Sequence, residues 1–499
     1  MVQLRDGYVV DLVYATKAYP ELSPTSLDTM ALMGGVAPPS SDEPSYLELG
    51  FGQGLSLNIA AAANPGVYRG VDFIPEHVAW AGRMAAASGA DLTVSADSFT
   101  EFAAEPGGED YDYITLHGVW SWADDPARRA IAEILQRRLR PGGLALISYN
   151  TPAGWAALEP MRQLFLRYSA ASGLAPAAAM KGAISLGLRL GELGGKYFAD
   201  NPVVMKELEK ISAMDPHYLV HEYLNEGHRI LSFADTHALL EGAGLDYVGP
   251  ARFAEYLDRR RLKGGALELI AGLDDPLLEE TVRDLMQASR FRSDLYVKRP
   301  APAADEAARR GHLFALVGAP DAPPVVERGK APGFQVLANE VWEVFAADPD
   351  TPVSMEAAIA ALPTRDASRI ELAFMSLCGV GGIAPYAEPT AKTQEQVAAL
   401  NRALMSETAE GRLIPTLAAA TTGGGVSVGL SPQLLLQAEA AGEADPAQAA
   451  TDRLLAQERR LVDKGSVIEG AEANLAEMRK RYESLGPIRA RLARLGAID

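Results

Sequence analysis

Short apolar runs alternate with helical periods along the first part of the chain. Runs at residues 46–49, 67–73, 92–96, 111–116 and 143–149 predict buried strands, and a smooth helical pattern at residues 55–63 follows the first of them. Strands that alternate with helices at this spacing form βαβ units. Residues 41–150 therefore predict a parallel, doubly wound α/β sheet.

Helical patterning takes over after residue 150. Stretches at residues 156–173 and 202–214 are helix-patterned and enclose a glycine-broken run at residues 182–195. We therefore expect a helical insertion over residues 151–230.

Strand patterns return beyond this insertion. A capped helix at residues 232–244 leads into a strand-like run at 245–253, and a second strand-like run at 291–298 follows a helical stretch at 265–289. Residues 231–300 are therefore expected to complete the interrupted sheet as its antiparallel edge.

The two ends of the chain lie outside this sheet. The leader, residues 1–40, predicts helices at 9–18 and 25–33, the second beginning at a Ser-Pro pair. A Pro- and Ala-rich linker at 300–304 opens a further module, and residues 391–499 are mainly helical. Three helices and then a short hairpin predict a winged-helix-like module over residues 301–390, with the helices at residues 335–347, 355–362 and 369–377.

Composition narrows the class of partner. The chain has 499 residues, 48% hydrophobic and 22% charged, which is ordinary for a globular protein of about two to four domains. Its net charge of −19 argues against a nucleic-acid partner, because binding to a phosphate backbone needs clustered Lys and Arg. We therefore interpret the winged-helix-like module as a protein-contact module, and a cationic substrate remains compatible with the charge.

Cysteine usage and the N-terminus predict the compartment. The single cysteine, Cys378, excludes an internal disulfide and a cysteine-cluster metal site, and it fits a reducing cytoplasm. The first residues lack the basic-then-apolar pattern of a signal peptide. Without an uninterrupted run of about 18 apolar residues, we expect no membrane span and a cytoplasmic location.

The most informative stretch is a glycine-rich turn between the first strand and its helix. Gly50, Gly52 and Gly54 allow a tight turn in which the backbone can approach a ligand, and the free N–H groups of the next helix point toward it. The spacing is G-x-G-x-G, with Leu55 where a dinucleotide motif has its third glycine. Glu48 precedes the turn and suits a cationic sulfonium better than a pyrophosphate, so we interpret the turn as a site for S-adenosylmethionine (SAM). A glycine turn with no ligand is the alternative.

Polar residues gather where the other strands end. Asp72 lies about 20 residues beyond the turn, where an acidic side chain holds the ribose hydroxyls. Asp97 is expected at the adenine end, and His117 and the pair Tyr149 and Asn150 follow the fourth and fifth strands. Because ligands of such sheets bind at the carboxyl ends of the strands, one pocket explains all of these residues.

These motifs resemble a known family. Y-L-E-L-G-F-G-Q-G, G-V-D-F, Y-D-Y-I-T-L-H-G-V-W-S-W and P-G-G-L-A-L-I-S-Y-N-T-P-A-G-W are similar to class I SAM-dependent methyltransferases with a methyltransferase regulatory domain, among them the rickettsial outer-membrane-protein lysine methyltransferases. The resemblance covers residues 8–300 well and the C-terminal part loosely. Phe51, where relatives usually have Cys, and the T-P-A-G-W order depart from the pattern.

The resemblance implies a Rossmann-like, seven-stranded class I methyltransferase sheet and a leader that closes over the cofactor. In the leader, Tyr14 and Tyr19 are either part of that cover or core aromatics. The expected cofactor-binding residues are Tyr19, Glu48, Gly50, Phe51, Gly52, Gly54, Asp72, Phe73, Ala96, Asp97, Ser98, His117 and Gly118.

The acceptor side is predicted from the same strand ends and from the insertion. His117, Tyr149 and Asn150 are the candidate catalytic residues, and Trp120, Trp122, His221 and Tyr223 the candidate substrate-binding residues. For each group the alternative is a structural role. His217, His221 and Glu222 raise the question of zinc, but the H-E-x-x-H order of a metalloprotease is absent and we expect no metal.

The predicted function is SAM-dependent methyl transfer, with S-adenosylhomocysteine as the product. The resemblance implies a protein lysine acceptor, which must lose a proton before it reacts, with help from Tyr149, Asn150 or His117. The alternatives are a small-molecule or secondary-metabolite methyltransferase and a non-catalytic SAM-binding scaffold. We expect a protein substrate as partner and consider a homodimer.

Overall fold

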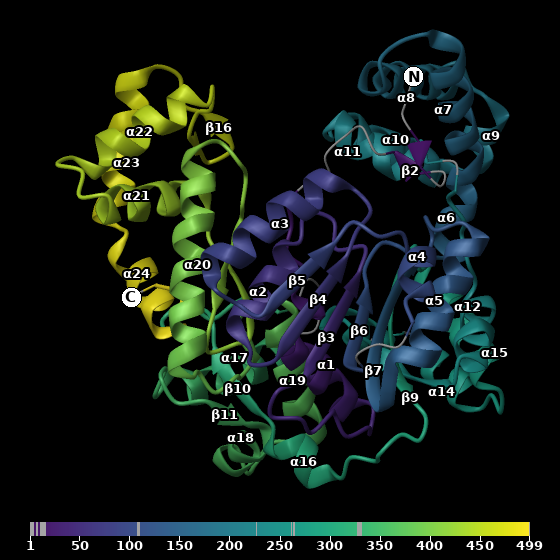
Figure 1. Cartoon of the computed structure of the whole chain (residues 1–499), viewed down its shortest axis with the longest axis horizontal. Helices are drawn as coiled ribbons and strands as arrows, with labels where there is room; N and C mark the ends of the chain where they lie inside the picture. Colours follow the sequence, from purple (N-terminus) through teal and green to yellow (C-terminus); the bar gives the residue numbers. More distant parts are fainter. Residues whose placement is uncertain are drawn as a thin grey trace.

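A seven-stranded sheet forms the centre of the chain (Figure 1). The computed structural model describes residues 4–5, 8–9, 16–106, 110–225, 227–260, 262, 265–326 and 332–498. The strand order is β5-β4-β3-β6-β7-β9-β8. The strands are β3 (Ser45–Leu49), β4 (Val67–Val71), β5 (Leu92–Ser95), β6 (Tyr111–Leu116), β7 (Leu139–Asn150), β8 (Leu245–Pro250) and β9 (Phe291–Lys298). This is the predicted class I methyltransferase-like sheet.

The two late strands complete the sheet, although the edge differs from the prediction. The first five strands pair in parallel, and β9 pairs antiparallel with both β7 and β8. Since β8 runs against β9, it has the direction of the first five strands. The edge strand is therefore β8, and the antiparallel strand β9 is interior.

Alternating residues of the strands face two layers of helices. Leu47, Ile114 and Ile147 pack with α4 (Phe99–Ala104), α5 (Asp125–Arg138) and α12 (Phe233–Gly242) in one core. Tyr46 and Leu146 belong to the core of the other face, where the covering helices are α1 (Pro24–Met33), α2 (Leu55–Ala63) and α3 (Pro75–Ser88). The sheet is thus buried on both sides, as a parallel sheet requires.

The insertion between β7 and β8 is helical, as predicted, and has its own core. It contains α6 (Pro152–Trp155), η2 (Ala156–Leu158), α7 (Glu159–Ser172), α8 (Pro176–Glu192), α9 (Lys196–Asp200), α10 (Pro202–Ser212) and α11 (Pro216–Tyr223). Residues 182–192 of the glycine-broken run instead belong to the continuous helix α8, which ends before Gly194 and Gly195. A Cβ at Gly182 would collide with Tyr168 and one at Gly191 with Met205, so these glycines permit close helix packing and do not break the helix.

Three helices lie between β8 and β9: α13 (Phe253–Arg260), α14 (Ala266–Ala271) and α15 (Pro276–Gln287). The following module contains α16 (Glu306–Gly311), β10 (Leu313–Leu316), α17 (Pro332–Ala346), β11 (Val353–Ser354), α18 (Met355–Ala361), α19 (Ala367–Gly379) and β12 (Ile383–Pro385). Its strands form a sheet in the order β11-β10-β12, so the predicted terminal hairpin is wrong. That this module is winged-helix-like stays a prediction.

The C-terminal region lies beside α2 and α3 (Figure 1). It contains α20 (Ala391–Ala409), β13 (Thr416–Ala419), β14 (Gly424–Ser427), α21 (Leu430–Ala440), α22 (Pro446–Ala456), β15 (Val462–Asp463), β16 (Ser466–Val467), α23 (Ala471–Glu483) and α24 (Gly486–Arg494). Leu400 and Leu434 share a core with Leu55 and Trp80, and Trp80 donates its indole hydrogen bond to Glu407 at 2.9 Å. Helices α2 and α3 are therefore packed between the sheet and this region.

The leader departs from its prediction in one element. β1 (Leu4–Arg5) pairs with β2 (Tyr8–Val9), and η1 (Pro20–Leu22) precedes α1. Val9 lies in β2 and residues 16–18 are not helical, while residues 10–15, with Tyr14, lie outside the described part of the chain. The second predicted helix is α1, capped by the Ser23 side chain as expected. Across the described residues, no helix combines the length and apolarity needed to cross a membrane.

Candidate functional site

A cavity of about 770 Å³ lies where β3, β4, β6 and β7 end. Residues that follow these strands form its inner wall, among them Gly50, Asp72, His117 and Asn150. The leader, residues after β5 and β8, α10, α11 and the start of β9 also line it. Its volume is in the range of about 300–1,000 Å³ that is typical of ligand pockets.

The glycines of the turn differ in their structural roles. Gly50, Gly52 and Gly54 have φ values of 72°, 58° and 72°, a region that disfavours other residues. A Cβ at Gly54 would lie 2.8 Å from that of Ala81, so this glycine lets α2 pack on α3 and does not line the cavity. A Cβ at Gly52 would meet nothing within 4 Å, which leaves the backbone there open to a ligand.

Glu48 presents an unsatisfied carboxylate to the cavity. The residue is 3% exposed, and its Oε2 has no hydrogen-bond partner among the described residues. Burial, with a smaller effect from the nearby Asp72 charge, raises the pKa of Glu48 to about 8. A cationic group bound beside it would therefore favour the ionised carboxylate and offset the cost of burying its charge.

Asp72 holds the glycine turn. Its Oδ2 accepts the Gly52 N–H at 2.8 Å, and its Oδ1 accepts the Ile74 N–H at 3.0 Å. The same Oδ1 lies 3.2 Å from Nδ1 of His77, which also lines the cavity. The buried Nε2 of His77 has no partner among the described residues, so it is a further polar group for a ligand.

Tyr19 and His117 lie together at the cavity. The Tyr19 N–H donates to Ser56 Oγ at 2.9 Å, and its ring centroid lies 3.9 Å from that of His117. Ser148 Oγ accepts the Gly118 N–H at 2.7 Å and is 3.4 Å from Nδ1 of His117. Burial lowers the pKa of His117 to about 4, so the imidazole is neutral at physiological pH.

The acceptor side combines β7 and β9 with the insertion. Asn150 pairs with Phe291 across the two strands, and both line the cavity. Tyr223 Oη accepts a hydrogen bond from Arg290 at 2.8 Å, and the Arg290 guanidinium lies 4.6 Å from the centre of the Trp155 ring. Trp122, His221 and Tyr223 also line the cavity.

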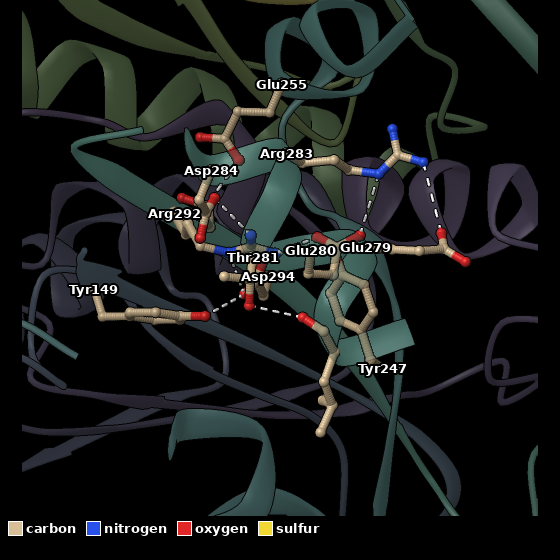
Figure 2. Close-up of polar contacts among 12 residues, drawn as sticks. Tyr149, Tyr247, Glu255, Glu279, Glu280, Thr281, Arg283, Asp284, Arg292 and Asp294 are labelled. Atoms are coloured by element: carbon tan, nitrogen blue, oxygen red, sulfur yellow. Dashed lines mark hydrogen bonds and ion pairs between the residues drawn. The ribbon is translucent and has the colours of Figure 1, made fainter. Parts of the chain in front are cut away.

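Five predicted residues are not among the described residues that line this cavity: Gly54, Ala96, Asp97, Trp120 and Tyr149. Trp120 is fully buried in the core under α5. Tyr149 points to the face opposite to Asn150 and donates its hydroxyl hydrogen bond to Asp294 at 2.6 Å, as Figure 2 shows. The remaining predicted residues, Tyr19, Glu48, Gly50, Phe51, Gly52, Asp72, Phe73, Ser98, His117, Gly118, Trp122, Asn150, His221 and Tyr223, are brought together.

Sequence reasoning missed several residues of the cavity wall. Glu21, Glu207, Arg252, Arg290 and Phe291 line it, although none follows a strand of the first five. Arg290 and Phe291 arrive only through the pairing of β9 with β7, which no local pattern reveals. His77 had one usable signal, its position in the first turn of a helix that follows an acidic strand end.

No group of three His, Cys, Asp or Glu residues in the described part of the chain could hold a metal ion. The side chain of His217 is outside that part.

Comparisons with known proteins agree with the fold. A family described as a methyltransferase domain matches residues 26–182, and one described as a predicted methyltransferase regulatory domain matches residues 215–298. An uncharacterized protein of Synechocystis sp. is 29% identical over 490 residues, which cover 96% of each chain. PKMT2 from Rickettsia typhi is similar in structure, with a TM-score of 0.67 at 17% identity over 97% of this chain and 99% of that one. The same Rickettsia protein in complex with AdoHcy is similar too, with a TM-score of 0.67 at 18% identity.

The fold and the matched domain define a SAM-dependent methyltransferase. The cofactor is therefore SAM. More narrowly, the chain combines a methyltransferase domain with a methyltransferase regulatory domain, as its motifs predicted.

The cavity fits this cofactor. The Glu48 carboxyl group, whose Oε2 has no partner among the described residues, suits a cation, and the open space at Gly52 and Gly118 allows close approach to the backbone. A Cβ at Gly118, where φ is 66°, would likewise meet nothing within 4 Å.

Proposed function

We propose that this protein transfers methyl groups from SAM to the ε-amino nitrogen of lysine side chains in a protein substrate. The observation that carries the proposal is the composition of the outer cavity wall, where α11 contributes the carboxyl group of Glu222 and the rings of Tyr218 and Tyr223, while the Glu207 carboxylate of α10 is paired with Arg290. Acidic and aromatic groups favour an amine that arrives as a cation. The motif resemblance to protein lysine methyltransferases supports the same acceptor.

The cofactor half of the cavity is proposed to bind SAM through the loops after the strands. Glu48 and the turn at Gly52 would hold the methionine part, Asp72 the ribose, and Phe73 and Ser98 the adenine side. Bound SAM supplies an electrophilic methyl group on a sulfonium, so the chain itself must align the acceptor and exclude water.

The acceptor must lose a proton before it reacts. Burial, opposed by Arg290, raises the pKa of Glu222 to about 7, so this carboxylate can take a proton from an ammonium near neutral pH. Asn150 is proposed to orient the resulting amine, and Trp122 to pack against its alkyl chain. His117, neutral and stacked on Tyr19, is proposed to separate the two halves of the cavity.

Three broader statements belong to this proposal. We place the reaction in the cytoplasm, assign the module at residues 301–390 a winged-helix-like, protein-contacting role, and consider a homodimer. The single cysteine supports the compartment, and the acidic charge supports the protein-contacting role.

The test is transfer of radiolabelled methyl groups from SAM to a lysate of the native host that lacks this protein. Label on protein, with methyl-lysine found by mass spectrometry, is the expected result. The matched control is Gly52→Val, which fills the open space at the turn and should abolish both SAM binding and transfer. Label confined to small molecules would identify a small-molecule methyltransferase, and SAM binding without any transfer would identify a scaffold. Either outcome would overturn the proposal.

A further inference from the structure

A buried histidine lies against the side chain of Asn150. His228 belongs to the loop after α11 and is 4% exposed. Its ring centroid lies 4.4 Å from that of Trp122 and 4.9 Å from that of Trp155. Two indoles thus fix the ring of a residue that has no part in the proposed chemistry so far.

The contact between the two side chains has a defined direction. His228 Nε2 lies 3.2 Å from Asn150 Nδ2. An amide nitrogen donates and has no lone pair to accept with, so the imidazole nitrogen must accept. His228 is therefore neutral, with its proton on Nδ1. Burial, together with the charges of nearby arginines, lowers its pKa to about 3 and keeps it neutral.

Backbone hydrogen bonds fix this arrangement. The Asn150 N–H donates to Ser121 Oγ at 2.8 Å, and the Leu231 N–H donates to the Asn150 carbonyl at 2.9 Å. The Arg229 N–H donates to the Ser121 carbonyl at 2.7 Å. The loop of His228 and the end of β7 are therefore one hydrogen-bonded unit.

The direction of this hydrogen bond determines which amide atom of Asn150 is available to a ligand in the cavity. With Nδ2 directed at His228, the carbonyl Oδ1 is turned away from the ring. An amine that is ready for methylation needs its lone pair for the methyl group and donates its N–H groups elsewhere. The carbonyl oxygen of Asn150 can accept a hydrogen bond from such an N–H. If the amide were inverted, its NH₂ group would face the N–H of the amine, and neither group could accept.

We propose that His228 is a positioning residue that keeps the carbonyl oxygen of Asn150 directed at the acceptor nitrogen. The inference rests on the proposed function, because it needs an acceptor that donates an N–H. It does not depend on whether that amine belongs to a protein or to a small molecule.

The first test needs no acceptor. The full-length protein, labelled with ¹⁵N in its seven histidines, is studied by NMR, with His228→Phe to assign the signals. We expect His228 to carry its proton on Nδ1. In Asn150→Asp the carboxylate can only accept, so the proton should move to Nε2. A wild-type His228 protonated on Nε2 would mean an inverted amide and would overturn the proposal.

The second test is a double-mutant cycle on methyl transfer. His228→Phe keeps the ring but removes the acceptor atom, and it should lower kcat by about 10- to 100-fold with SAM affinity unchanged. His228→Gln, whose carbonyl can accept, should recover part of the rate. In an Asn150→Asp background His228→Phe should cost little more, because the two carboxylate oxygens are equivalent. Equal losses in both backgrounds would mean a structural role and would overturn the proposal.

The two tests separate the two proposals. A wild-type protein that methylates no amine would refute the proposed function, while the histidine tautomer would still decide the direction of the Asn150 amide.

Discussion

Glu48 couples cofactor binding to proton release. With a pKa of about 8, the carboxyl group of Glu48 is mostly uncharged at neutral pH, whereas a cationic ligand favours its ionised form. Binding should therefore release a proton below pH 8. We expect SAM affinity to rise with pH by up to about tenfold per pH unit and to level off above pH 8. Titration calorimetry in buffers of different ionisation enthalpy measures both the affinity and the proton.

Substitution identifies the group responsible. Glu48→Gln should bind SAM more weakly and with little pH dependence over this range. Glu222→Gln is the matched control, because Glu222 also titrates near neutral pH but lies on the acceptor side. An unchanged pH slope in Glu48→Gln would contradict this account.

Tyr149 and Asn150 are adjacent in the sequence, but we expect their substitutions to have different effects. Tyr149→Phe removes a buried hydrogen bond to Asp294 and should cost about 1.5–3 kcal/mol of unfolding free energy, with methyl transfer retained. Asn150→Leu should abolish transfer, because its side chain lines the cavity. Urea unfolding and a transfer assay on both variants make the comparison. Loss of methyl transfer in a folded Tyr149→Phe protein would instead mean that Tyr149 is a catalytic residue.

Sequence reasoning reached the inner wall of the cavity and missed much of its outer wall. The carboxyl ends of parallel strands meet at one edge, so Glu48, Asp72 and Asn150 could be predicted. Tyr149 could not be excluded, because only the strand pairing shows which of two adjacent residues faces the cavity. Asp97 lies in the loop after β5, where the sequence does not show that the next residue, Ser98, is the one that lines the cavity.

At the scale of elements, one arginine joins α15 to β9. Arg292 binds Glu280 at 2.8 Å, Asp284 at 2.8 Å and Asp294 at 3.0 Å (Figure 2). All of these side chains are buried. The nearby carboxylates, with Asp294 the strongest influence, raise the pKa of Arg292 well above its usual range despite its burial.

Arg292→Leu would remove the guanidinium that three buried carboxylates share, leaving Asp294 with the Tyr149 hydroxyl and Glu280 with Arg283. We expect a loss of about 3–5 kcal/mol of unfolding free energy. The matched control is Arg189→Leu on α8, whose partner Glu192 is exposed and whose loss should cost about 1 kcal/mol or less. Urea denaturation measures both values. Similar small losses would mean that the carboxylates are satisfied by other groups.

Elements were predicted where local chemistry determines them. The capped helix α1, helix α2 and strand β9 follow from caps and apolar periods. The glycines of α8 were misinterpreted because their function, close contact with Tyr168 and Met205, depends on how α8 packs against α7 and α10, which the local pattern does not show. The terminal hairpin failed for the same reason, since β12 pairs with β10, which lies nearly seventy residues before it.

At the scale of the whole molecule, the C-terminal region covers the helices of the cofactor turn. Ile59, Trp80 and Met84 share a core with residues of α20 and α21. Arg412 also lies 3.3 Å from the Gln53 side chain in the cavity wall. This region is therefore part of the structure that holds the glycine turn.

A chain that ends at residue 390 would expose this core. We expect it to aggregate or to bind SAM much more weakly than the full-length protein, because α2 and α3 lose one of their two packing layers. Light scattering, circular dichroism and calorimetry on the two chains make the comparison. A monomeric, folded fragment with full SAM affinity would show that the region is an independent appendage.

The insertion leaves the sheet at Asn150 and returns beside it, since the Leu231 N–H donates to the Asn150 carbonyl at 2.9 Å. A cassette whose two ends meet can be exchanged or remodelled without a change in strand order. New methylation targets could thus evolve through changes within about eighty contiguous residues, while the part of the sheet that binds the methyl donor stays unchanged.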